Sequence, residues 1–239
     1  MGEEGIRINK YLAGAGICSR READRLIDEG RIQVNDRPCK RGCRVMPRDT
    51  VSVDGRKVDI TIEPRVYLAY NKPAGIVCTS DKKEKDNIID HIDHPVRLTY
   101  AGRLDKRSTG LIIMTNDGDL INAMMRSRLA HEKEYEVSVD KDITDGFLKA
   151  MEGGVYIKEL DETTRRCRVV KKGDKSFNII LTQGLNRQIR RMCEALGYKV
   201  RTLRRIRVVN ITLGDLAEDE YRRLTDEELI TLRRRIGIS

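Results

Sequence analysis

The most constraining feature of this sequence is a short apolar run near its middle. Residues 111–115 read Leu-Ile-Ile-Met-Thr, and a run of this length that is almost wholly apolar is typical of a central strand buried within a sheet. Other segments have the composition of strands and alternate with segments of helical period. The predicted fold class is therefore α+β, with a mixed or antiparallel sheet flanked by helices. The additional predicted strands are residues 66–70, 135–139, 177–182 and 208–213.

Two helices are predicted in this larger part of the chain. The first follows Asn186, which we expect to cap it, and Gly197 ends it. The second begins at Thr225, and Glu228 stands three residues later, which is the pattern of a capping box. The expected apolar faces are Ile189, Met192, Cys193 and Leu196 in the first helix, and Leu229, Leu232 and Ile236 in the second.

The first sixty or so residues predict a smaller unit of two short helices followed by short strands. Residues 8–15 have helical spacing of their apolar side chains. Ser19 stands three residues before Glu22, so a second capped helix is expected there, and Gly30 ends it. The dipeptide at residues 54–55, Asp-Gly, indicates a hairpin turn between two of the strands.

A linker is predicted between the two parts, at residues 61–65. Pro64 favours an extended conformation in the residue before it. After this segment, the chain alternates predicted strands with predicted helices. We therefore divide the chain into a small N-terminal module, residues 1–63, and a larger domain, residues 64–239.

The charge balance indicates a polyanionic partner. The chain has 47 Lys and Arg against 38 Asp and Glu, a net charge of +9, and nucleic acid is the commonest partner of a basic protein. No apolar stretch reaches the roughly 18 residues that a membrane span needs, and the N-terminus lacks the apolar core of a signal peptide. We expect a cytoplasmic protein that does not contact membranes and that is a monomer.

The cysteines and histidines give no indication of a metal site. None of the six cysteines forms a C-x-x-C pair, and the chain has only three histidines. Free thiols in a reducing cytoplasm are the expected state. Nucleotide-binding and zinc-protease motifs are absent as well, so we expect neither a metal nor another cofactor.

Positive charge is concentrated in residues 187–207, which contain eight basic residues and a single acidic one. Arg187 and Arg191 lie four residues apart and should share a helix face. A solvated face usually mixes charges of both signs, so this density favours a surface that follows a phosphate backbone. The alternative is a basic face that binds nothing.

The most unusual stretch is residues 100–111, just before the central strand. It combines Gly102, Arg103, Asp105 and Gly110 in one loop, and a rigid strand often presents functional side chains on such a loop. Composition alone favours a different interpretation, a surface ion pair in a tight turn.

This loop, Gly-Arg-Leu-Asp at residues 102–105 followed by Ser-Thr-Gly-Leu-Ile-Ile-Met-Thr-Asn at 108–116, resembles the catalytic loop of ribosomal RNA pseudouridine synthases of the RsuA family. Further motifs in the same order are similar to that family, most of all to its RluF type, which acts on large-subunit (23S) ribosomal RNA. They are Asn-Lys-Pro-Ala-Gly at 71–75, Lys-Glu-Tyr at 133–135, Gly-Leu-Asn-Arg-Gln-Ile-Arg-Arg-Met at 184–192, and the N-terminal unit, which is similar to a ribosomal-protein RNA-binding module.

The resemblance implies that the chain isomerises uridine to pseudouridine without a cofactor. Asp105 would be the essential carboxylate, acting either as a base at the ribose or as a nucleophile at the sugar. A cation would hold it ionised, and either Arg190 or Arg103 could supply that charge. Tyr135 would stack on the target base, although its position alone favours a core residue, because Val137 and Val139 share its strand face.

The resemblance also implies an RNA partner, most specifically a stem-loop region of 23S ribosomal RNA, and it leaves tRNA open as a second substrate. Leu181 or Ile180 would form an apolar floor beneath the base. A different class of function, a non-catalytic RNA-binding or ribosome-assembly factor, would use the same basic surfaces. The residues expected to contact RNA are Arg7, Lys10, Arg20, Arg21, Arg187, Arg191, Arg201, Arg204 and Arg205.

Overall fold

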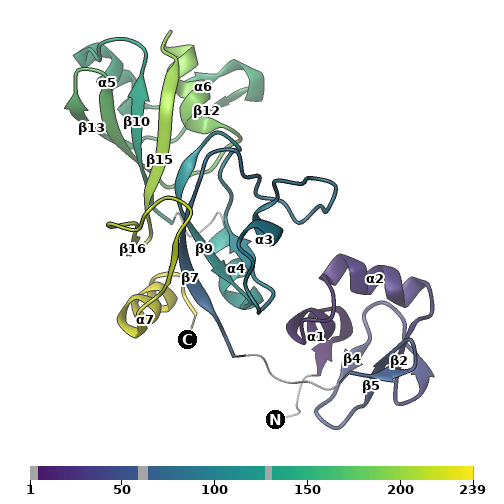
Figure 1. Ribbon diagram of the computed structural model, residues 1–239. Helices are drawn as coiled ribbons and strands as arrows, with labels where there is room; N and C mark the ends of the chain where they lie inside the picture. The colour runs from purple at the N-terminus through teal and green to yellow at the C-terminus, as the bar shows by residue number, and fades with distance from the viewer. Residues whose placement is uncertain (1–4, 59–63, 127–130, 239) are drawn as a thin grey trace. The chain divides into compact units, whose positions relative to one another are not determined.

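The computed structural model describes residues 5–58, 64–126 and 131–238 (Figure 1). The described residues up to Arg65, together with Pro95–Arg97, form one compact unit. Val66–His94 and the residues from Leu98 onward form the second. Each unit has its own apolar core, so each is described by itself.

The N-terminal unit places two helices against small sheets. Strands β2 and β5 pair antiparallel at its centre, β3 and β6 extend that sheet on either side, and β1 pairs with β4. Ile8, Leu12 and Ile32 are among the buried residues of its core. The elements are β1 Ile6–Arg7, α1 Ile8–Gly14, α2 Arg20–Asp28, β2 Ile32–Val34, β3 Arg37–Pro38, β4 Arg44–Val45, β5 Val51–Val53 and β6 Arg56–Lys57.

The predicted start of α2 is confirmed. The Ser19 hydroxyl accepts a hydrogen bond from the Glu22 amide at 3.1 Å, which satisfies one of the amides that a helix leaves free at its first turn. The Glu22 side chain pairs instead with Arg25. The reciprocal hydrogen bond of a full capping box is therefore replaced by an ion pair within the helix.

The second unit is built on a nine-stranded mixed sheet with the order β13-β14-β10-β15-β9-β7-β17, to which β8 and β16 add at β9 and β15. Its elements are β7 Tyr67–Lys72, α3 Ile88–His91, β8 Thr99–Ala101, β9 Thr109–Thr115, α4 Gly118–Met125, β10 Lys133–Val139, α5 Asp145–Gly153, β11 Tyr156–Ile157, a 3-10 turn Lys158–Leu160, β12 Glu162–Thr163, β13 Arg168–Gly173, β14 Ser176–Leu181, α6 Gln188–Ala195, β15 Val200–Val208, β16 Ile211–Thr212, β17 Tyr221–Arg223 and α7 Asp226–Arg235.

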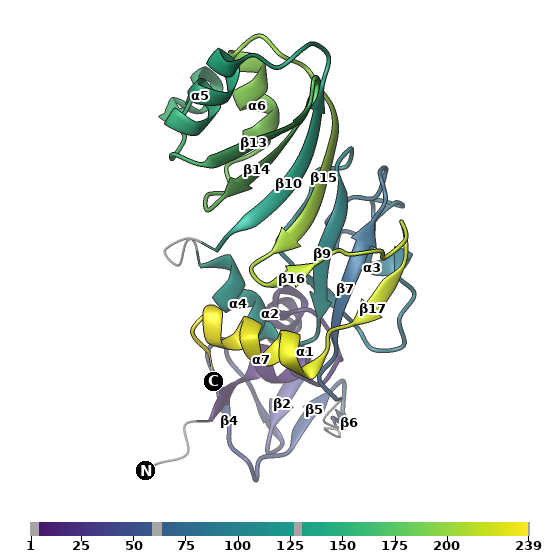
Figure 2. The same ribbon diagram turned by 90° about the vertical axis from the view of Figure 1, so that its left-hand side faces the viewer.

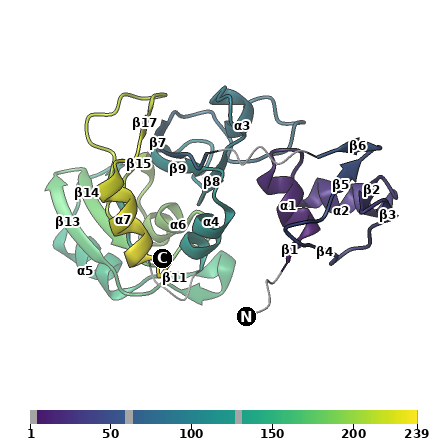
Figure 3. The same ribbon diagram turned by 90° about the horizontal axis from the view of Figure 1, so that it is seen from below.

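Helices cover this sheet at both of its ends, as the predicted fold class requires. Helices α5 and α6 lie over one face of the β13–β14–β10–β15 half (Figure 2), and Phe147 and Met192 anchor them in its core. Helices α4 and α7 pack with the β8–β9–β7 half (Figure 3), where Leu120 and Leu232 are fully buried. Strand β9 lies between β15 and β7 in the sheet, and its residues 111–115 are all buried, which confirms the predicted central strand.

Two local predictions were wrong. Residues 208–213 do not form one strand, because Val209 adopts a left-handed conformation (φ 56°) and turns the chain from β15 into β16. Helix α6 is not capped by Asn186, since its N-cap residue is Arg187, also left-handed (φ 53°). The side chain of Gln188 accepts the Leu185 amide at 3.0 Å and stabilises that turn instead.

The cap predicted at Thr225 is confirmed in full. The Thr225 hydroxyl accepts from the Glu228 amide, and the Glu228 carboxylate accepts from the Thr225 amide. All six cysteines are free thiols, as expected. Across the described ranges, the structure contains no helix that combines the length and the apolarity needed to cross a membrane.

Candidate active site

The loop that carries Asp105 lies between β8 and β9 and is held from several sides. The Ser108 amide donates to the Asp105 carbonyl oxygen at 3.0 Å and closes a tight turn. Outside the turn, the Gly75 amide donates to the Lys106 carbonyl at 2.8 Å, and the Leu104 amide contacts the Cys78 sulfur at 3.4 Å. The segment that follows β7 therefore supports the loop, and Asp105 is presented half-buried.

A glycine fixes where this loop joins the sheet. Gly110 pairs with Arg205 in the two-residue parallel ladder between β9 and β15. It has a φ of +103°, and a Cβ there would stand 2.3 Å from the Arg205 carbonyl oxygen. Only glycine allows the two backbones to approach this closely without strain. The end of the Asp105 loop is therefore locked against the middle of β15.

The register of the sheet aligns four residues from four strands. Lys72 on β7 pairs with Gly110, Gly110 pairs with Arg205, and Arg205 pairs with Tyr135 on β10. Directly paired residues point to the same face of a sheet. We call Lys72, Gly110, Arg205 and Tyr135 the cross-sheet row. It brings the tyrosine and two cations to the face that the Asp105 loop borders.

Arg190 reaches the same loop from helix α6. Its guanidinium Nη2 lies 3.4 Å from the Ser108 hydroxyl oxygen, to which it donates. Burial and the charge of Arg187 lower the pKa of Arg190, and the nearby charge of Asp105 opposes that shift. An arginine stays protonated under such a shift. Arg190 thus supplies a buried positive charge close to Asp105.

Two lysines that the sequence reasoning left without a role belong to the same cluster. Lys72 is fully buried, and its ammonium donates to the carbonyl oxygens of Pro73 at 2.6 Å and Ile76 at 2.9 Å. Burial lowers the pKa of Lys72, and Asp105 is among the groups that oppose this. Burial and the charge of Arg205 also lower the pKa of Lys133. For Lys72, the available signal was a lysine at the end of the largely apolar segment 66–72.

The structure separates the two arginines proposed to steady Asp105. The Arg103 side chain is exposed. Its backbone carbonyl oxygen accepts a hydrogen bond from Arg205 Nη1 of strand β15 at 3.3 Å. Arg190 is buried against the loop. Of the two residues considered for an apolar floor, the buried Leu181 pairs with Lys133 and shares the face of Tyr135, whereas Ile180 points to the other face.

Tyr135 itself is half-buried and packs against the core beneath α5 and α6. Val137 and Val139 follow it on the same face and are buried in that core. This position fits the interpretation of Tyr135 as a core residue, and its stacking on the target base stays a prediction. Its ring borders the core, and its register partner Arg205 connects it to the Asp105 loop.

The basic run at 187–207 is not one continuous surface, which corrects the sequence interpretation. Its second half is strand β15, whose side chains alternate between faces. Arg205 is only 2% exposed, so it does not form part of an RNA-contacting surface. Three others form ion pairs, Arg191 with Glu159, Arg204 with Glu136, and Arg207 with Glu132 and Glu134.

The remaining predicted RNA contacts lie on the surface. Arg187 and Arg201 are exposed on the larger unit. On the N-terminal unit, Arg7, Lys10, Arg20 and Arg21 are exposed around helices α1 and α2. These residues keep side chains accessible to a polyanion.

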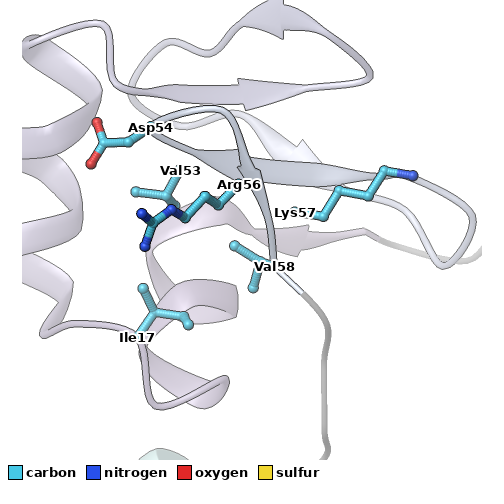
Figure 4. Close-up of a pocket in the computed structure, with 6 residues that line it drawn as sticks. All are labelled: Ile17, Val53, Asp54, Arg56, Lys57 and Val58. Carbon is cyan, nitrogen blue, oxygen red and sulfur yellow. The ribbon is translucent and has the colours of Figure 1, made fainter.

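Two hollows lie outside the Asp105 region. One, of about 540 Å³, is in the N-terminal unit beside the β5–β6 hairpin (Figure 4), lined by Ile17, Val53, Asp54, Arg56, Lys57 and Val58. The other, of about 530 Å³, is lined in part by Asn71, Thr109 and Arg204, each of which directly precedes a residue of the cross-sheet row. Because side chains alternate along a strand, this hollow lies behind that row. Within residues 5–58, 64–126 and 131–238, no group of three or more His, Cys, Asp or Glu is placed to hold a metal ion.

Comparison with known proteins agrees with this arrangement. Residues 66–195 match the family model of RNA pseudouridylate synthase, and residues 6–51 match that of the S4 domain. The dual-specificity RNA pseudouridine synthase RluF of Escherichia coli K12 is 48% identical over 96% of this chain and 79% of its own length. The ribosomal large subunit pseudouridine synthase B of Bacillus subtilis is 32% identical over 95% of both chains.

Among solved structures, a crystal structure of a pseudouridylate synthase superposes with a TM-score of 0.69 at 29% identity, covering 95% of this chain and 99% of the other. The match therefore extends over both units, and the synthase family model spans the Asp105 loop and helix α6. The chain belongs to the RNA pseudouridine synthases of the RsuA family, in its RluF-like branch.

Proposed function

We propose that this RNA pseudouridine synthase modifies a specific uridine of large-subunit ribosomal RNA, with Asp105 as its essential carboxylate. The observation that carries the proposal is the convergence on one loop. Arg190 donates to Ser108, and Arg205 of the cross-sheet row donates to Arg103, so both cations bind the loop that presents Asp105. The Bacillus subtilis relative is named for the large ribosomal subunit.

The reaction is an isomerisation. The bond between N1 of uracil and C1′ of the ribose breaks, the base turns, and C5 bonds to C1′. The proton that leaves C5 balances the one that N1 gains, so substrate and product have the same atoms and no oxidant or reductant is consumed. Asp105 takes part in its ionised form, either removing a proton from the ribose or attacking C1′. Both routes need a carboxylate stabilised by nearby positive charge.

The roles of the neighbouring residues follow from their positions. Arg190 supplies a buried positive charge whose interaction with the half-buried Asp105 favours the ionised carboxylate. We assign to Tyr135 the stacking on the uracil and to Leu181 its apolar floor, which the position of both residues on one sheet face supports. The two buried lysines add positive potential to this side of the sheet.

The target uridine must leave its stack before Asp105 can reach C1′, which costs a few kcal/mol and less for an unpaired base. We therefore propose a stem-loop region as the target. The S4 module, through Arg7, Lys10, Arg20 and Arg21, and the larger unit, through Arg187 and Arg201, bind the RNA backbone together, and two modules on one RNA raise its affinity.

The test is an incubation of the purified protein with 23S ribosomal RNA fragments tritiated at C5 of uridine, with tRNA transcripts assayed in parallel. We expect tritium release from the ribosomal fragment and a pseudouridine-specific chemical label at one position. Release from tRNA as well would identify tRNA as a second substrate of this chain. RNA binding without tritium release from any transcript would instead identify a non-catalytic RNA-binding factor.

A further inference from the structure

We infer that Arg205 is a positioning residue for the reaction, which ties the Asp105 loop at Arg103 to strand β9, into which the loop runs. Its Nε donates to the Leu111 carbonyl oxygen at 2.7 Å, and its Nη1 donates to the Arg103 carbonyl oxygen at 3.3 Å. These two carbonyls stand on either side of Asp105 in the chain. One guanidinium thus closes the loop as a clamp, and the inference rests on the proposed role of Asp105.

The position of Arg205 in the sheet makes this clamp rigid. Gly110 fixes its backbone from one side through the close parallel contact, and Tyr135 pairs with it from the other. Its side chain is 2% exposed, so solvent does not compete for its hydrogen bonds. A displacement of Arg205 would therefore move the Asp105 loop relative to Tyr135.

Retention of a charged group here is costly for folding. The third nitrogen, Nη2, is buried and has no hydrogen-bond partner among the residues that the structure describes. The charge of Arg205 further lowers the pKa values of the buried Lys72 and Lys133. The positive charges of these residues therefore repel one another. A buried charge without full pairing destabilises a fold, which indicates that Arg205 serves the loop.

Arginine is the side chain that fits this role. Its planar fork presents several N–H groups in fixed directions and can reach two carbonyl oxygens at once. A lysine retains the charge, but all its donors radiate from one nitrogen on a flexible stem, so it cannot place two separate nitrogens at the Leu111 and Arg103 carbonyl oxygens with the fixed spacing of the guanidinium. Charge and clamp can therefore be separated by Arg205→Lys, and Arg205→Gln removes both.

A matched control is available in the same sheet. Arg222 on β17 is part-buried and pairs with Glu228 at 2.8 Å, away from the Asp105 loop. Arg222→Gln removes an arginine and its hydrogen bonds and leaves the loop contacts in place. It therefore reports the general cost of losing a part-buried arginine from this unit.

The experiment measures kcat, KM and RNA dissociation constants of the three full-length variants on the 23S fragment, with thermal unfolding to establish the folded fraction. Because a displacement of about 1 Å can cost roughly 100-fold in rate, we expect kcat to fall about 100-fold in both Arg205 variants, with KM and RNA binding unchanged. Arg222→Gln should keep the wild-type kcat. Hydrogen exchange of residues 103–111 should accelerate in the Arg205 variants only.

Several results would overturn the inference. These are wild-type kcat in a folded Arg205→Lys or Arg205→Gln protein, a loss confined to RNA binding, or unfolding of both variants, which would assign Arg205 to the stability of the whole sheet. If the wild-type protein forms no pseudouridine, the proposed function fails. Hydrogen exchange of residues 103–111 then still tests the clamp by itself.

Discussion

Gly110 and Arg205 face each other across the parallel pair of β9 and β15, where a Cβ on the glycine would come within 2.3 Å of the arginine carbonyl oxygen. The contact joins the two halves of the sheet. It also sets the distance between the loop that precedes β9 and the strand that carries Arg205. The candidate site therefore depends on the absence of a side chain at one position.

The first prediction concerns that glycine. Gly110→Ala combines a clash with the β15 backbone and a φ of +103° that L residues rarely adopt, so we expect a loss of at least about 2 kcal/mol in the free energy of unfolding. Urea unfolding measures it. Gly118→Ala is the control, because nothing lies within 4 Å of its Cβ position. Equal stability of the two variants would contradict the close contact.

The second prediction concerns the carboxylate. Asp105→Asn keeps the shape of the side chain and removes its charge and basicity, so we expect turnover to fall by at least about 100-fold while RNA binding persists. Tritium release and a filter-binding assay measure the two properties. Asp86→Asn, at an exposed carboxylate paired with Lys106 at 3.2 Å, should remain active. Undiminished pseudouridine formation by Asp105→Asn would refute the assignment.

The third prediction concerns the N-terminal module. Replacement of Arg20 and Arg21 by Gln should weaken RNA binding and reduce the slope of log affinity against log salt by about one for each phosphate that the variant no longer binds. Arg25→Gln on the same helix is the control, since Arg25 already pairs with Glu22 and Glu29. Titrations at several salt concentrations measure the slopes. An equal change in all variants would show that helix α2 makes no specific phosphate contact.

The fourth prediction concerns pH. Burial lowers the pKa of His131 below its ordinary 6.5, against a weaker opposing effect of the hydrogen bond with the Ala123 carbonyl. The unfolded chain therefore binds a proton first, and the stability associated with neutral His131 is lost as pH falls below 6.5 toward the folded pKa. His131→Gln should flatten this part of the stability curve. Parallel curves for the two proteins between pH 7 and 5 would contradict it.

The local elements of this protein were predictable because their signals lie in neighbouring residues. The cap at Ser19, the capping box of Thr225 and Glu228, and the buried strand at 111–115 depend on spacing within a few positions. The failures at Val209 and Arg187 have a common cause. Both residues adopt left-handed turns that nothing in their side chains favours, so packing around them imposes the conformation.

The site divides in the same way. The sequence by itself determined that Asp105 stands on a loop before a buried strand and, by resemblance, which residues accompany it. The tertiary structure alone decided that Arg205 turns inward and that Lys72, Gly110 and Tyr135 align with it. The physical reason is that strand alternation sends each side chain to one of two faces. Pairing with strands distant in the chain decides which face is buried. The residues next to Arg205 in the sequence therefore do not show which face its side chain takes.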